Sequence, residues 1–289
     1  MTEAVLSLEN VVKKFGGFAA VDGLSFEVAR GEIFGFLGPN GAGKTTTLRM
    51  ILDIIQPTSG RIAILGSSSA IPVRHRIGYL PEERGLYRKM RVAETIAYFA
   101  KLRGVSSGEA KRRAFDLLES FGLKEFARAK NEALSKGMAQ KVQLLSTIAH
   151  DPEFLILDEP FSGLDPINQA TLEDLIRSLK KEGRTIIFST HVMQHAERLC
   201  DRFLILAKGR KRFEGDIVEA RAAFPHRLVL RTPDSVEGLR AAPGVRKIVP
   251  LGESAETGEQ DYEIFLASGA DPQLVLKAAF EAGIRLSRF

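Results

Sequence analysis

Residues 33–46 have the sequence IFGFLGPNGAGKTT, in which an apolar run leads directly into a glycine-rich segment. The continuous apolar run from Ile33 to Leu37 predicts a buried strand. After it comes a glycine-rich segment with the spacing G-x-x-x-x-G-K-[ST], and then a helix-like segment from Lys44 to Ile54. A strand, a glycine-rich loop and a helix in this order are typical of a loop that binds nucleotide phosphates.

The chemistry of this loop suits phosphate binding along its whole length. Glycines let the backbone wrap closely around phosphates and point its N–H groups at them, and the positive end of the following helix adds to the attraction. We expect Lys44 to neutralise the β- and γ-phosphates of ATP and Thr45 to ligate Mg²⁺. The residues expected to hold the phosphates are Gly38, Asn40, Gly41, Ala42, Gly43, Lys44, Thr45 and Thr46. Taken alone, the loop indicates an NTPase or a kinase and nothing narrower.

A second strand-like run ends in two acids, at Phe154-Leu-Ile-Leu-Asp158-Glu159. The interior of a buried strand cannot accommodate two carboxylates, but its end can present them at the edge of an active site. Asp158 suits the coordination shell of Mg²⁺, and Glu159 suits polarising the attacking water as a general base. Two acids that merely end a strand are the alternative, and the phosphate loop upstream argues against it.

The order of apolar patterns predicts an α/β core. Residues 1–30 alternate between apolar and polar types, which predicts antiparallel strands. Later strand-like runs alternate with helical stretches and predict parallel βαβ units; these runs lie at 154–157, 185–189 and 203–206. From Val92 to Phe121 apolar residues recur at helical spacing, which predicts a helical insertion from 92 to about 137.

The residues after about 223 carry no further chemical motif and predict a second, smaller domain. Their patterns follow in the order βαββαβ, which suggests a ferredoxin-like domain. The expected strands are 226–231, 245–251, 262–267 and 284–288, and the expected helices are 235–241 and 271–282. We therefore expect an α/β domain over 1–222, with a helical subdomain at about 88–140, and a small α+β accessory domain over 223–289.

The composition excludes several classes of protein. Hydrophobic residues make up 44% and charged residues 27%, close to the average of globular proteins. No apolar run approaches the ~20 residues that cross a bilayer, and the acidic N-terminus without a long apolar core predicts no signal peptide. Because Cys200 is the only cysteine, an internal disulfide and a cysteine-based zinc site are excluded. We expect a soluble protein in a reducing cytoplasm.

The formal charge of +5 is concentrated in one segment. Residues 82–136 contain thirteen Lys and Arg against eight Asp and Glu, so the rest of the chain is about neutral. A basic stripe of this kind indicates nucleic acid, an anionic membrane surface or a solvated helix face. Charge alone favours the solvated face and leaves the other two open.

The sequence Leu134-Ser-Lys-Gly-Met-Ala-Gln-Lys-Val142 resembles LSGGQ-x-Q-R-V, the signature sequence of ABC ATPases. Other motifs of that family occur in the family's order: the adenine-stacking aromatic at Phe15, the Q-loop position at Glu82, the D-loop at 162–165 and the switch histidine at His191. Over about residues 5–220 the chain therefore resembles an ABC ATPase. The resemblance implies a P-loop NTPase ABC cassette with a mixed central sheet, an antiparallel β subdomain and a helical subdomain.

The resemblance also implies roles for residues within one site. Phe15 would stack on adenine, which contributes ~1–3 kcal/mol by analogy with base stacking on aromatic residues. Glu82 would help Thr45 and Asp158 to organise Mg²⁺, directly or through water. The implied catalytic residues are Glu159 as the base, His191 as the group that stabilises the γ-phosphate, and Lys44.

A dimer is implied as well. In the family, Ser135 and Gly137 contact the γ-phosphate held by the facing subunit, and Asp165 lies at the dimer interface, where it couples the two sites. A two-fold head-to-tail dimer satisfies both sites at once. The implied partners are a second ATP-binding subunit, identical or paralogous, and a membrane-spanning permease, with no nucleic acid expected. The chain would then be cytoplasmic, held at the inner face of the cell membrane through the permease.

Three positions depart from the family pattern. Lys136 replaces a signature glycine, Met138 replaces the signature glutamine, and Glu82 replaces the Q-loop glutamine. Because a thioether cannot hydrogen-bond as an amide does, we do not expect the side chain of Met138 to contact nucleotide. Slower or more tightly gated hydrolysis is one consequence that these departures allow.

The strings at 80–87, 134–137 and 161–168 resemble the sodium- or drug-export type of bacterial ABC ATPase, which carries a small C-terminal domain after the cassette. An exporter is therefore implied, whereas the substrate is selected by the permease. In the family, the Q-loop and the helical insertion meet a cytoplasmic helix of the permease. The residues expected to line that contact, or else to face anionic lipid, are Arg84, Leu86, Tyr87, Arg88, Lys89, Met90 and Arg91.

Two other functions remain open. The first is a soluble ABC ATPase of DNA repair, chromosome handling or translation. Such proteins usually carry a coiled-coil insertion, zinc cysteines or a second cassette, and this sequence contains none of these. The second function is that of a regulatory module in which the cassette is a nucleotide switch and residues 223–289 are the sensor. The retained acid Glu159 argues for genuine hydrolysis instead.

Overall fold

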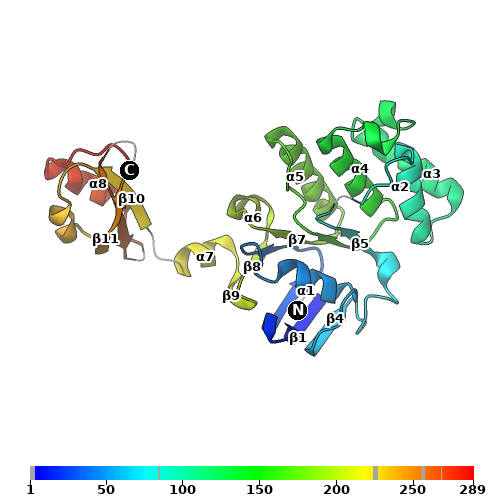
Figure 1. The fold of residues 1–289 in the computed structure, drawn as a ribbon, viewed down its shortest axis with the longest axis horizontal. Coiled ribbons are helices and arrows are strands. Elements are labelled where there is room, and N and C mark those ends of the chain that lie inside the picture. The colour runs from blue at the N-terminus through cyan, green and yellow to red at the C-terminus, as the bar shows by residue number, and fades with distance from the viewer. Residues whose placement is uncertain (1–3, 84, 224–226, 255–257, 268) are drawn as a thin grey trace. The chain divides into compact units, whose positions relative to one another are not determined.

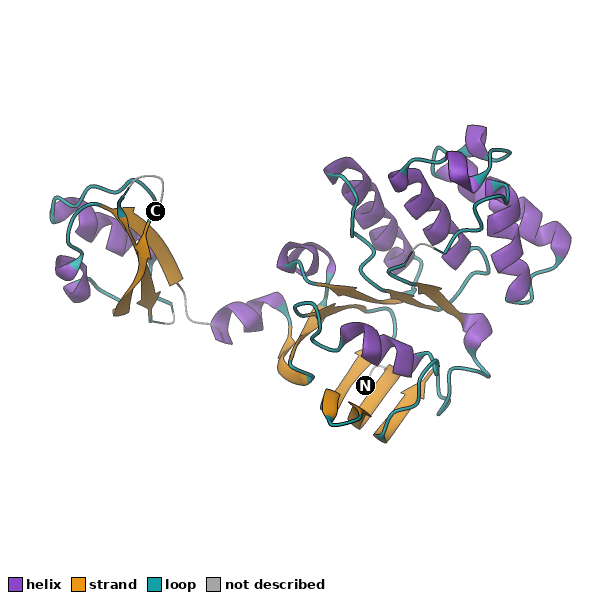
Figure 2. Cartoon of the chain, viewed as in Figure 1, coloured by secondary structure: helices purple, strands orange, loops and turns teal. Residues whose placement is uncertain are grey.

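The computed structural model describes residues 4–83, 85–223, 227–254, 258–267 and 269–289. The chain divides into two compact units, Met1–Asp216 and Ile217–Phe289 (Figures 1 and 2). The boundary predicted at 222/223 lies at the end of helix α7 (Ile217–Ala223), which belongs to the second unit. Among the described residues, no helix combines the length and the apolar character that a membrane span requires.

A six-stranded mixed sheet forms the centre of the first unit. Its strand order is β5-β6-β7-β3-β8-β9, in which only β9 runs antiparallel to its neighbour. The strands are β5 (Ile77–Leu80), β6 (Phe154–Leu157), β7 (Thr185–Thr190), β3 (Ile33–Leu37), β8 (Arg202–Ala207) and β9 (Arg210–Gly215). Every residue of β3, β6 and β7 is buried, as expected of parallel strands that are covered on both faces. The α/β core predicted from the sequence is confirmed.

One face of the central sheet packs on helix α1 (Lys44–Ile51) and on a second, antiparallel sheet of order β2-β1-β4. The strands of that sheet are β1 (Ala4–Phe15), β2 (Phe18–Ala29) and β4 (Ser59–Ile64). Phe34 and Phe36 point to this face from β3, and their rings lie 5.4 and 5.6 Å from that of Phe26. Because successive residues of a strand point to opposite faces, the residues of β3 that alternate with Phe34 and Phe36 point to the opposite face of the central sheet.

The opposite face packs on three helices, α4 (Lys136–Ile148), α5 (Pro166–Lys181) and α6 (Met193–Leu199) (Figure 1). Leu155, Leu157 and Phe188 are fully buried against them. Asp165 is the N-cap of helix α5, and its carboxylate accepts the N–H of Asn168. The two covered faces therefore leave the ends of the strands as the place where polar groups gather.

The predicted helical insertion is present and has its own core. Helices α2 (Val92–Leu102) and α3 (Ser107–Ser120) pack with α4 around Ile96, Leu118 and Leu145. Short 3-10 turns lie at Arg74–Arg76, Lys124–Phe126 and Asn131–Ala133. The helical pattern predicted over 92–121 corresponds to two helices, α2 and α3, which are separated where Gly104 adopts a φ of 93° and Ser106 caps the second helix.

The second unit contains a three-stranded antiparallel sheet of order β10-β12-β11. Its elements are α7, β10 (Arg227–Thr232), a 3-10 turn (Glu237–Ala241), β11 (Val245–Glu253), β12 (Gln260–Leu266) and α8 (Pro272–Glu281). The strand expected over 284–288 is reduced to one bridge between Arg231 and Arg288. A reason is visible at Arg285, whose backbone N–H donates to the carboxylate of Asp234 and so is lost to strand pairing. The ferredoxin-like topology stays a prediction, and His226 of the first expected strand lies outside the described residues.

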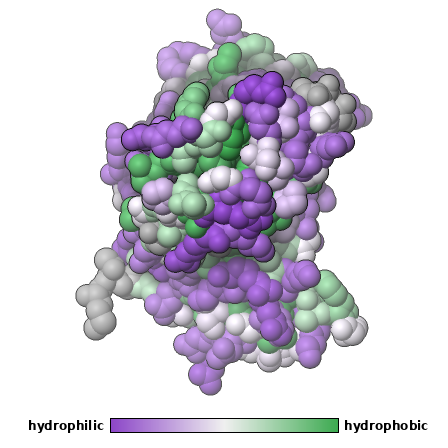
Figure 3. Space-filling view, turned by 90° about the vertical axis from the view of Figure 1, so that its left-hand side faces the viewer, coloured by the Kyte–Doolittle hydropathy of each residue, from purple (hydrophilic) through white to green (hydrophobic). Residues whose placement is uncertain are grey.

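The surface of the second unit exposes several large apolar side chains. They are Val218, Leu251, Leu274, Phe280 and Phe289. On the face of the molecule seen in Figure 3, hydrophilic residues predominate and surround smaller hydrophobic patches. Scattered apolar groups of this kind are normal on soluble domains and identify no ligand.

Candidate functional site

The glycine-rich loop between β3 and α1 is packed too tightly for side chains at two positions. A Cβ at Gly38 would lie 2.3 Å from the carbonyl oxygen of Leu206, and a Cβ at Gly43 would lie 2.4 Å from that of Ala20. Gly41 has open space around it, but its φ of 76° favours glycine. The loop is therefore closely packed against the protein at Gly38 and Gly43 and is open at Gly41.

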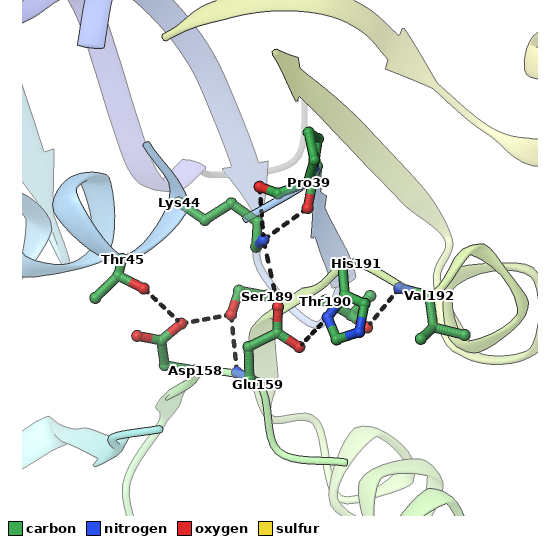
Figure 4. A network of polar contacts seen from close by, with 10 residues as sticks. Pro39, Lys44, Thr45, Asp158, Glu159, Ser189, Thr190, His191 and Val192 are labelled. Carbon is green, nitrogen blue, oxygen red and sulfur yellow. Dashed lines mark hydrogen bonds and ion pairs between the residues drawn. The ribbon is translucent and has the colours of Figure 1, made fainter. Parts of the chain in front are cut away.

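Lys44 is buried at the start of α1 and points back into the loop (Figure 4). Its Nζ donates to the carbonyl oxygen of Gly38 at 2.6 Å and to that of Pro39 at 3.3 Å. The same Nζ lies 3.3 Å from Oε1 of Glu159. One ammonium group thus links the phosphate loop to the acids at the end of β6, as the sequence predicted for a shared site.

The other expected loop residues differ in how accessible they are. Asn40 and Gly41 are exposed, whereas Thr46 is half-buried. Ala42 is buried, its N–H donates to the carbonyl of Pro39, and its carbonyl accepts the N–H of Gly209. In this conformation the N–H of Ala42 is therefore already hydrogen-bonded within the protein. The exposed part of the loop is better placed to bind phosphate.

Asp158 is held by hydroxyl groups from two neighbouring elements (Figure 4). Thr45 Oγ1 donates to its Oδ1 at 3.3 Å, and Ser189 Oγ donates to the same atom at 2.5 Å. Ser189 Oγ also accepts the N–H of Glu159 at 2.8 Å. Burial raises the pKa of Asp158 above its ordinary value of 3.8, and the two hydroxyl hydrogen bonds oppose that shift.

These groups fit a magnesium ion. Oδ2 of Asp158 is buried and has no hydrogen-bond partner among the described residues, an arrangement that a cation would relieve. Magnesium prefers hard oxygen ligands and is usually held by one or two protein groups plus phosphate and water. Among the described residues, no group of three or more His, Cys, Asp or Glu is placed to hold a metal ion.

Glu82, the third expected magnesium residue, stands apart. Its side chain is exposed, and no hydrogen bond or ion pair joins it to Thr45 or Asp158 within the described ranges. The pKa of Tyr79 is raised to about 12, mainly by burial and then by the negative charge of Asp158. Glu82 lies close enough to Tyr79 to add a smaller contribution of the same sign. Its direct part in the metal site remains a prediction.

Glu159 occupies a strained backbone position between Lys44 and His191. Its φ is 46°, a left-handed conformation that few residues other than glycine adopt. The side chain is buried, with Oε2 lying 3.1 Å from Nδ1 of His191, and Oε1 has no hydrogen-bond partner among the described groups. The ring of His191, at the end of β7, is half-exposed. The carboxylate of Glu159 is therefore held between the ammonium group of Lys44 and the half-exposed ring of His191.

Phe15 ends strand β1 with its side chain 53% exposed. Gly16 and Gly17 follow, and Phe18 pairs with it across the hairpin. The ammonium group of Lys13 lies 5.1 Å from the centre of the Phe15 ring. Such an accessible aromatic face suits stacking of a base.

The residues expected to act on the opposing subunit form a separate cluster. Ser135 caps α4 and accepts the N–H of Met138 at 3.3 Å, and Asp165 accepts the side-chain amide of Asn168 at 2.7 Å. A Cβ at Gly137 would lie 2.7 Å from that same amide nitrogen of Asn168. Within the described residues, no hydrogen bond or ion pair joins Ser135, Gly137 or Asp165 to the phosphate-loop network. Met138 packs on the helical core instead of pointing outward.

Sequence reasoning missed Ser189, which ties both acids to β7. The available signal was a pair of hydroxyl residues, Ser189 and Thr190, at the end of an otherwise apolar strand and directly before His191. It also missed Gln140, which donates to the carbonyl of Pro160 at 3.1 Å and so reaches the residue after Glu159.

Comparisons with known proteins agree with this geometry. The family model described as ABC transporter matches residues 21–162. The uncharacterized ABC transporter ATP-binding protein YhaQ of Bacillus subtilis (strain 168) is 43% identical over 242 residues, covering 83% of this chain and 81% of the relative. Nod factor export ATP-binding protein I of Paraburkholderia xenovorans (strain LB400) is 42% identical over 218 residues, covering 74% and 72%. A solved structure described as the ATP binding subunit of an ABC transporter superposes with a TM-score of 0.69 at 34% identity, covering 75% of this chain and 92% of that one.

Proposed function

This chain belongs to the ATP-binding family of ABC transporters, and on that premise we propose that two copies, or one copy and a paralogue, complete each other's ATP sites. The chain is the ATP-hydrolysing motor subunit of a transporter, and subunits of this kind dimerise and work with membrane permeases. The observation that carries the proposal is the separation of two clusters within one chain. Lys44, Thr45, Asp158 and Glu159 form one network, while Ser135, Gly137 and Asp165 lie in another.

An isologous dimer explains why the second cluster is accessible. Ser135 and Asp165 are exposed, and the hydrogen bonds of their side chains to described residues stay within the first turns of α4 and α5, so both remain available to a facing surface. A two-fold interface duplicates every contact, and therefore each copy would offer its Ser135 helix to the phosphate loop of the other. The test is ATP-dependent pairing of a form that binds ATP but cannot turn it over.

Within each site, Glu159 is the proposed general base. Lys44 Nζ and His191 Nδ1 lie 3.3 and 3.1 Å from its two carboxylate oxygens and hold it in place. When Lys44 turns to the β- and γ-phosphates, Oε1 of Glu159 is released to accept a proton from the attacking water. The half-exposed ring of His191 would then face the γ-phosphate beside it.

Thr45 and Asp158 are the proposed magnesium ligands. Thr45 Oγ1 and Oδ2 of Asp158, which has no hydrogen-bond partner in the described part of the chain, would hold the ion, which neutralises charge on the phosphates. Ser189 keeps the other carboxylate oxygen of Asp158 engaged and so fixes which oxygen faces the ion. Glu82 would act through water, since its side chain is exposed and makes no direct contact with these residues within the described part of the chain.

The proposed contact with the permease is the segment 85–91 together with the cavity beneath it. A cavity of about 190 Å³ there is lined by residues that include Leu86, Phe99 and Arg103. Tyr87 is half-exposed and lies against the rings of Tyr98 and Phe99, so the three rings form an aromatic rim that reaches the cavity at Phe99. Arg84, also expected here, lies outside the described residues.

Basic side chains flank this rim and suit a cytoplasmic helix that carries acidic groups. Arg88 and Lys89 are exposed, and the backbone carbonyl of Arg88 accepts the N–H of Glu132. The segment is thereby fixed to the helical insertion while its charges face outward. Apolar anchors within a charged border are the usual composition of a helix-binding groove.

Charge reversal tests the docking proposal. The double substitution Arg88→Glu, Lys89→Glu should abolish co-purification with the permease, while the ATPase rate of the isolated subunit is retained. The matched control, Lys181→Glu with Arg212→Glu, reverses two exposed charges outside the segment and should leave assembly intact. Unchanged assembly of the first variant would reject the docking site.

We propose further that the transporter is an exporter, because one relative is named for Nod factor export. The substrate would be selected by the permease, and the chain would be cytoplasmic and lie at the inner face of the cell membrane through that partner. A soluble ABC ATPase of DNA or ribosomes is the competing assignment. Fractionation distinguishes the two: the proposal expects recovery with membranes, and recovery with DNA or ribosomes would replace it.

A further inference from the structure

The turn that carries Glu159 needs support from its surroundings. A non-glycine residue in the left-handed region costs roughly 1–3 kcal/mol and persists only where neighbouring groups hold it. Two hydrogen bonds are already evident: Ser189 Oγ accepts the N–H of Glu159, and Gln140 Nε2 donates to the carbonyl of Pro160. Both act on the backbone at the start of the turn.

A third support acts on a side chain. Phe161 is buried two residues after Glu159, and its ring is stacked on that of His195, with centroids 4.0 Å apart and an interplanar angle of 13°. The ring of Phe188 on β7 makes a T-shaped contact with the ring of Phe161, with centroids 5.8 Å apart. The ring of Phe161 is therefore held by two aromatic neighbours, and its position fixes the end of the turn that begins at Glu159.

His195 is itself fixed from a third element. It lies on α6, is 4% exposed, and its Nδ1 is 3.4 Å from Oε1 of Glu173 on α5. Glu173 is buried too, and its carboxylate also receives the guanidinium groups of Arg198 at 3.1 Å and Arg177 at 3.4 Å. A buried acid with three donors around it is a rigid anchor for the imidazole ring.

This chain of contacts joins the three segments on which the proposed site depends. The three segments are helix α5, which follows its N-cap Asp165, helix α6, which follows His191, and the turn that carries Glu159. The contacts that connect these segments run from Glu173 through His195 to Phe161, and within the described residues they do not extend to the phosphate loop. A core formed only for stability has no need of a histidine and a glutamate at such a junction, because burying them carries a desolvation cost.

We propose that His195, oriented by Glu173, is a positioning residue that holds Glu159 in its strained conformation through the ring of Phe161. The inference rests on the role proposed for Glu159 as the base. His195 is 4% exposed, and its ring contacts Phe161 and Glu173, both of which lie outside the phosphate loop. Its loss should therefore lower turnover and leave ATP affinity nearly unchanged.

The test compares kcat with ATP affinity in folded variants. His195→Leu removes both the stacking and the bond to Glu173 and should lower kcat about 10- to 100-fold, with the Kd for ATP changed less than about 2-fold. His195→Phe keeps an aromatic ring against Phe161 and should recover part of the loss, and it takes the place of the leucine variant if that one does not fold. A folded His195→Leu protein with unchanged kcat, or with kcat and affinity falling together, would overturn the proposal.

A double-mutant cycle isolates the route through Phe161. If His195 acts through that ring, Phe161→Leu combined with His195→Leu should be about as slow as the slower single variant, and independent additive losses would contradict the mechanism. The matched control is Glu153→Gln, which removes a carboxylate bonded to Arg76 at the opposite end of β6 and should lower stability with kcat intact. In the Glu159→Gln background, His195→Leu should have no further effect on turnover. If Glu159→Gln alone leaves turnover intact, the proposed base fails instead, which keeps the two failures distinguishable.

Discussion

The hydroxyl of Ser189 lies 2.5 Å from Oδ1 of Asp158 and joins the ends of two adjacent parallel strands. The same oxygen accepts the backbone N–H of Glu159, so a single side chain sets the position of both acids. Oδ2 of Asp158 is left without a partner among the described groups and faces the place proposed for magnesium. The metal site and the base are thus coupled through β7.

Removal of that hydroxyl should weaken magnesium binding. In Ser189→Ala the carboxylate of Asp158 can rotate, because only Thr45 then bonds it, and the loss should be about 1–1.5 kcal/mol or roughly tenfold. The measurement is the Mg²⁺ concentration that gives half-maximal ATPase activity. Ser146→Ala deletes a buried hydroxyl on α4 and should leave that concentration unchanged. Equal values in the two variants would contradict the assignment.

Lys44 should contribute to ATP binding itself. Its ammonium lies between the loop carbonyls and Glu159, and Lys44→Ala removes the charged contact to phosphate. We expect the Kd for ATP to rise by about 10- to 100-fold, or ~1.5–3 kcal/mol, as measured by calorimetry. Lys181→Ala, at an exposed position on α5, is the control. An unaltered Kd in Lys44→Ala would show that the loop binds nucleotide without this residue.

Phe15 has a matched neighbour that makes its role easy to test. Both Phe15 and Phe18 are exposed at the end of the same hairpin, at 53% and 65%. Phe15→Ala should weaken ATP binding by ~1–3 kcal/mol because a stacking surface for adenine is lost, whereas Phe18→Ala should not. Phe15→Tyr should keep the affinity. Competition with a ribose triphosphate that lacks the base checks the cause, since its binding should be the same in Phe15→Ala and the parent.

His150 should make stability depend on pH. Burial lowers its pKa from 6.5 to about 4, its Nε2 contacts the carbonyl of Ile77, and its Nδ1 has no partner among the described groups. The unfolded state therefore binds a proton that the folded state resists, so the free energy of unfolding should fall as pH drops from about 6.5 towards 4. The fall attributable to His150 should be at most about 3 kcal/mol, with none above pH 7.

Denaturant titration across that range measures the effect. His150→Gln keeps a donor for Ile77 and should flatten the curve, while His75→Gln at an exposed site should follow the parent. A parent and a His150→Gln variant with the same pH dependence would mean that the imidazole protonates equally well in the folded protein.

The elements that the sequence predicted well are those with local signals. The phosphate loop has fixed spacing, and the run before Asp158 is apolar throughout because β6 is covered on both faces. Local sequence patterns predict an element less well where a contact between residues distant in the sequence determines its structure. The prediction of a strand over 284–288 was wrong. The backbone N–H of Arg285 donates to the carboxylate of Asp234, fifty-one residues away in the sequence, and so cannot pair with a neighbouring strand. The break between α2 and α3 depends on the positive φ of Gly104, which apolar periodicity does not report.

The supporting residues of the site could not be predicted in the same way. Ser189 and Gln140 matter because of which strand or loop lies beside them, and that depends on the order of strands in the sheet. His195 is an ordinary helix residue by sequence, and only the fold brings its ring onto Phe161. Conversely, the sequence assigned Glu82 to the metal site, and the structure leaves that side chain exposed.

The pairing of two chains around ATP is tested most directly by Glu159→Gln. This variant keeps Lys44, the loop and Ser135, so it should bind ATP, hydrolyse it at a severely reduced rate and accumulate as a dimer. Sedimentation velocity with saturating ATP and Mg²⁺ should show that dimer, and the same protein with ADP, or with Ser135→Arg added, should sediment as a monomer. A Glu159→Gln protein that binds ATP yet stays monomeric, both alone and when its membrane partner is present, would contradict the account.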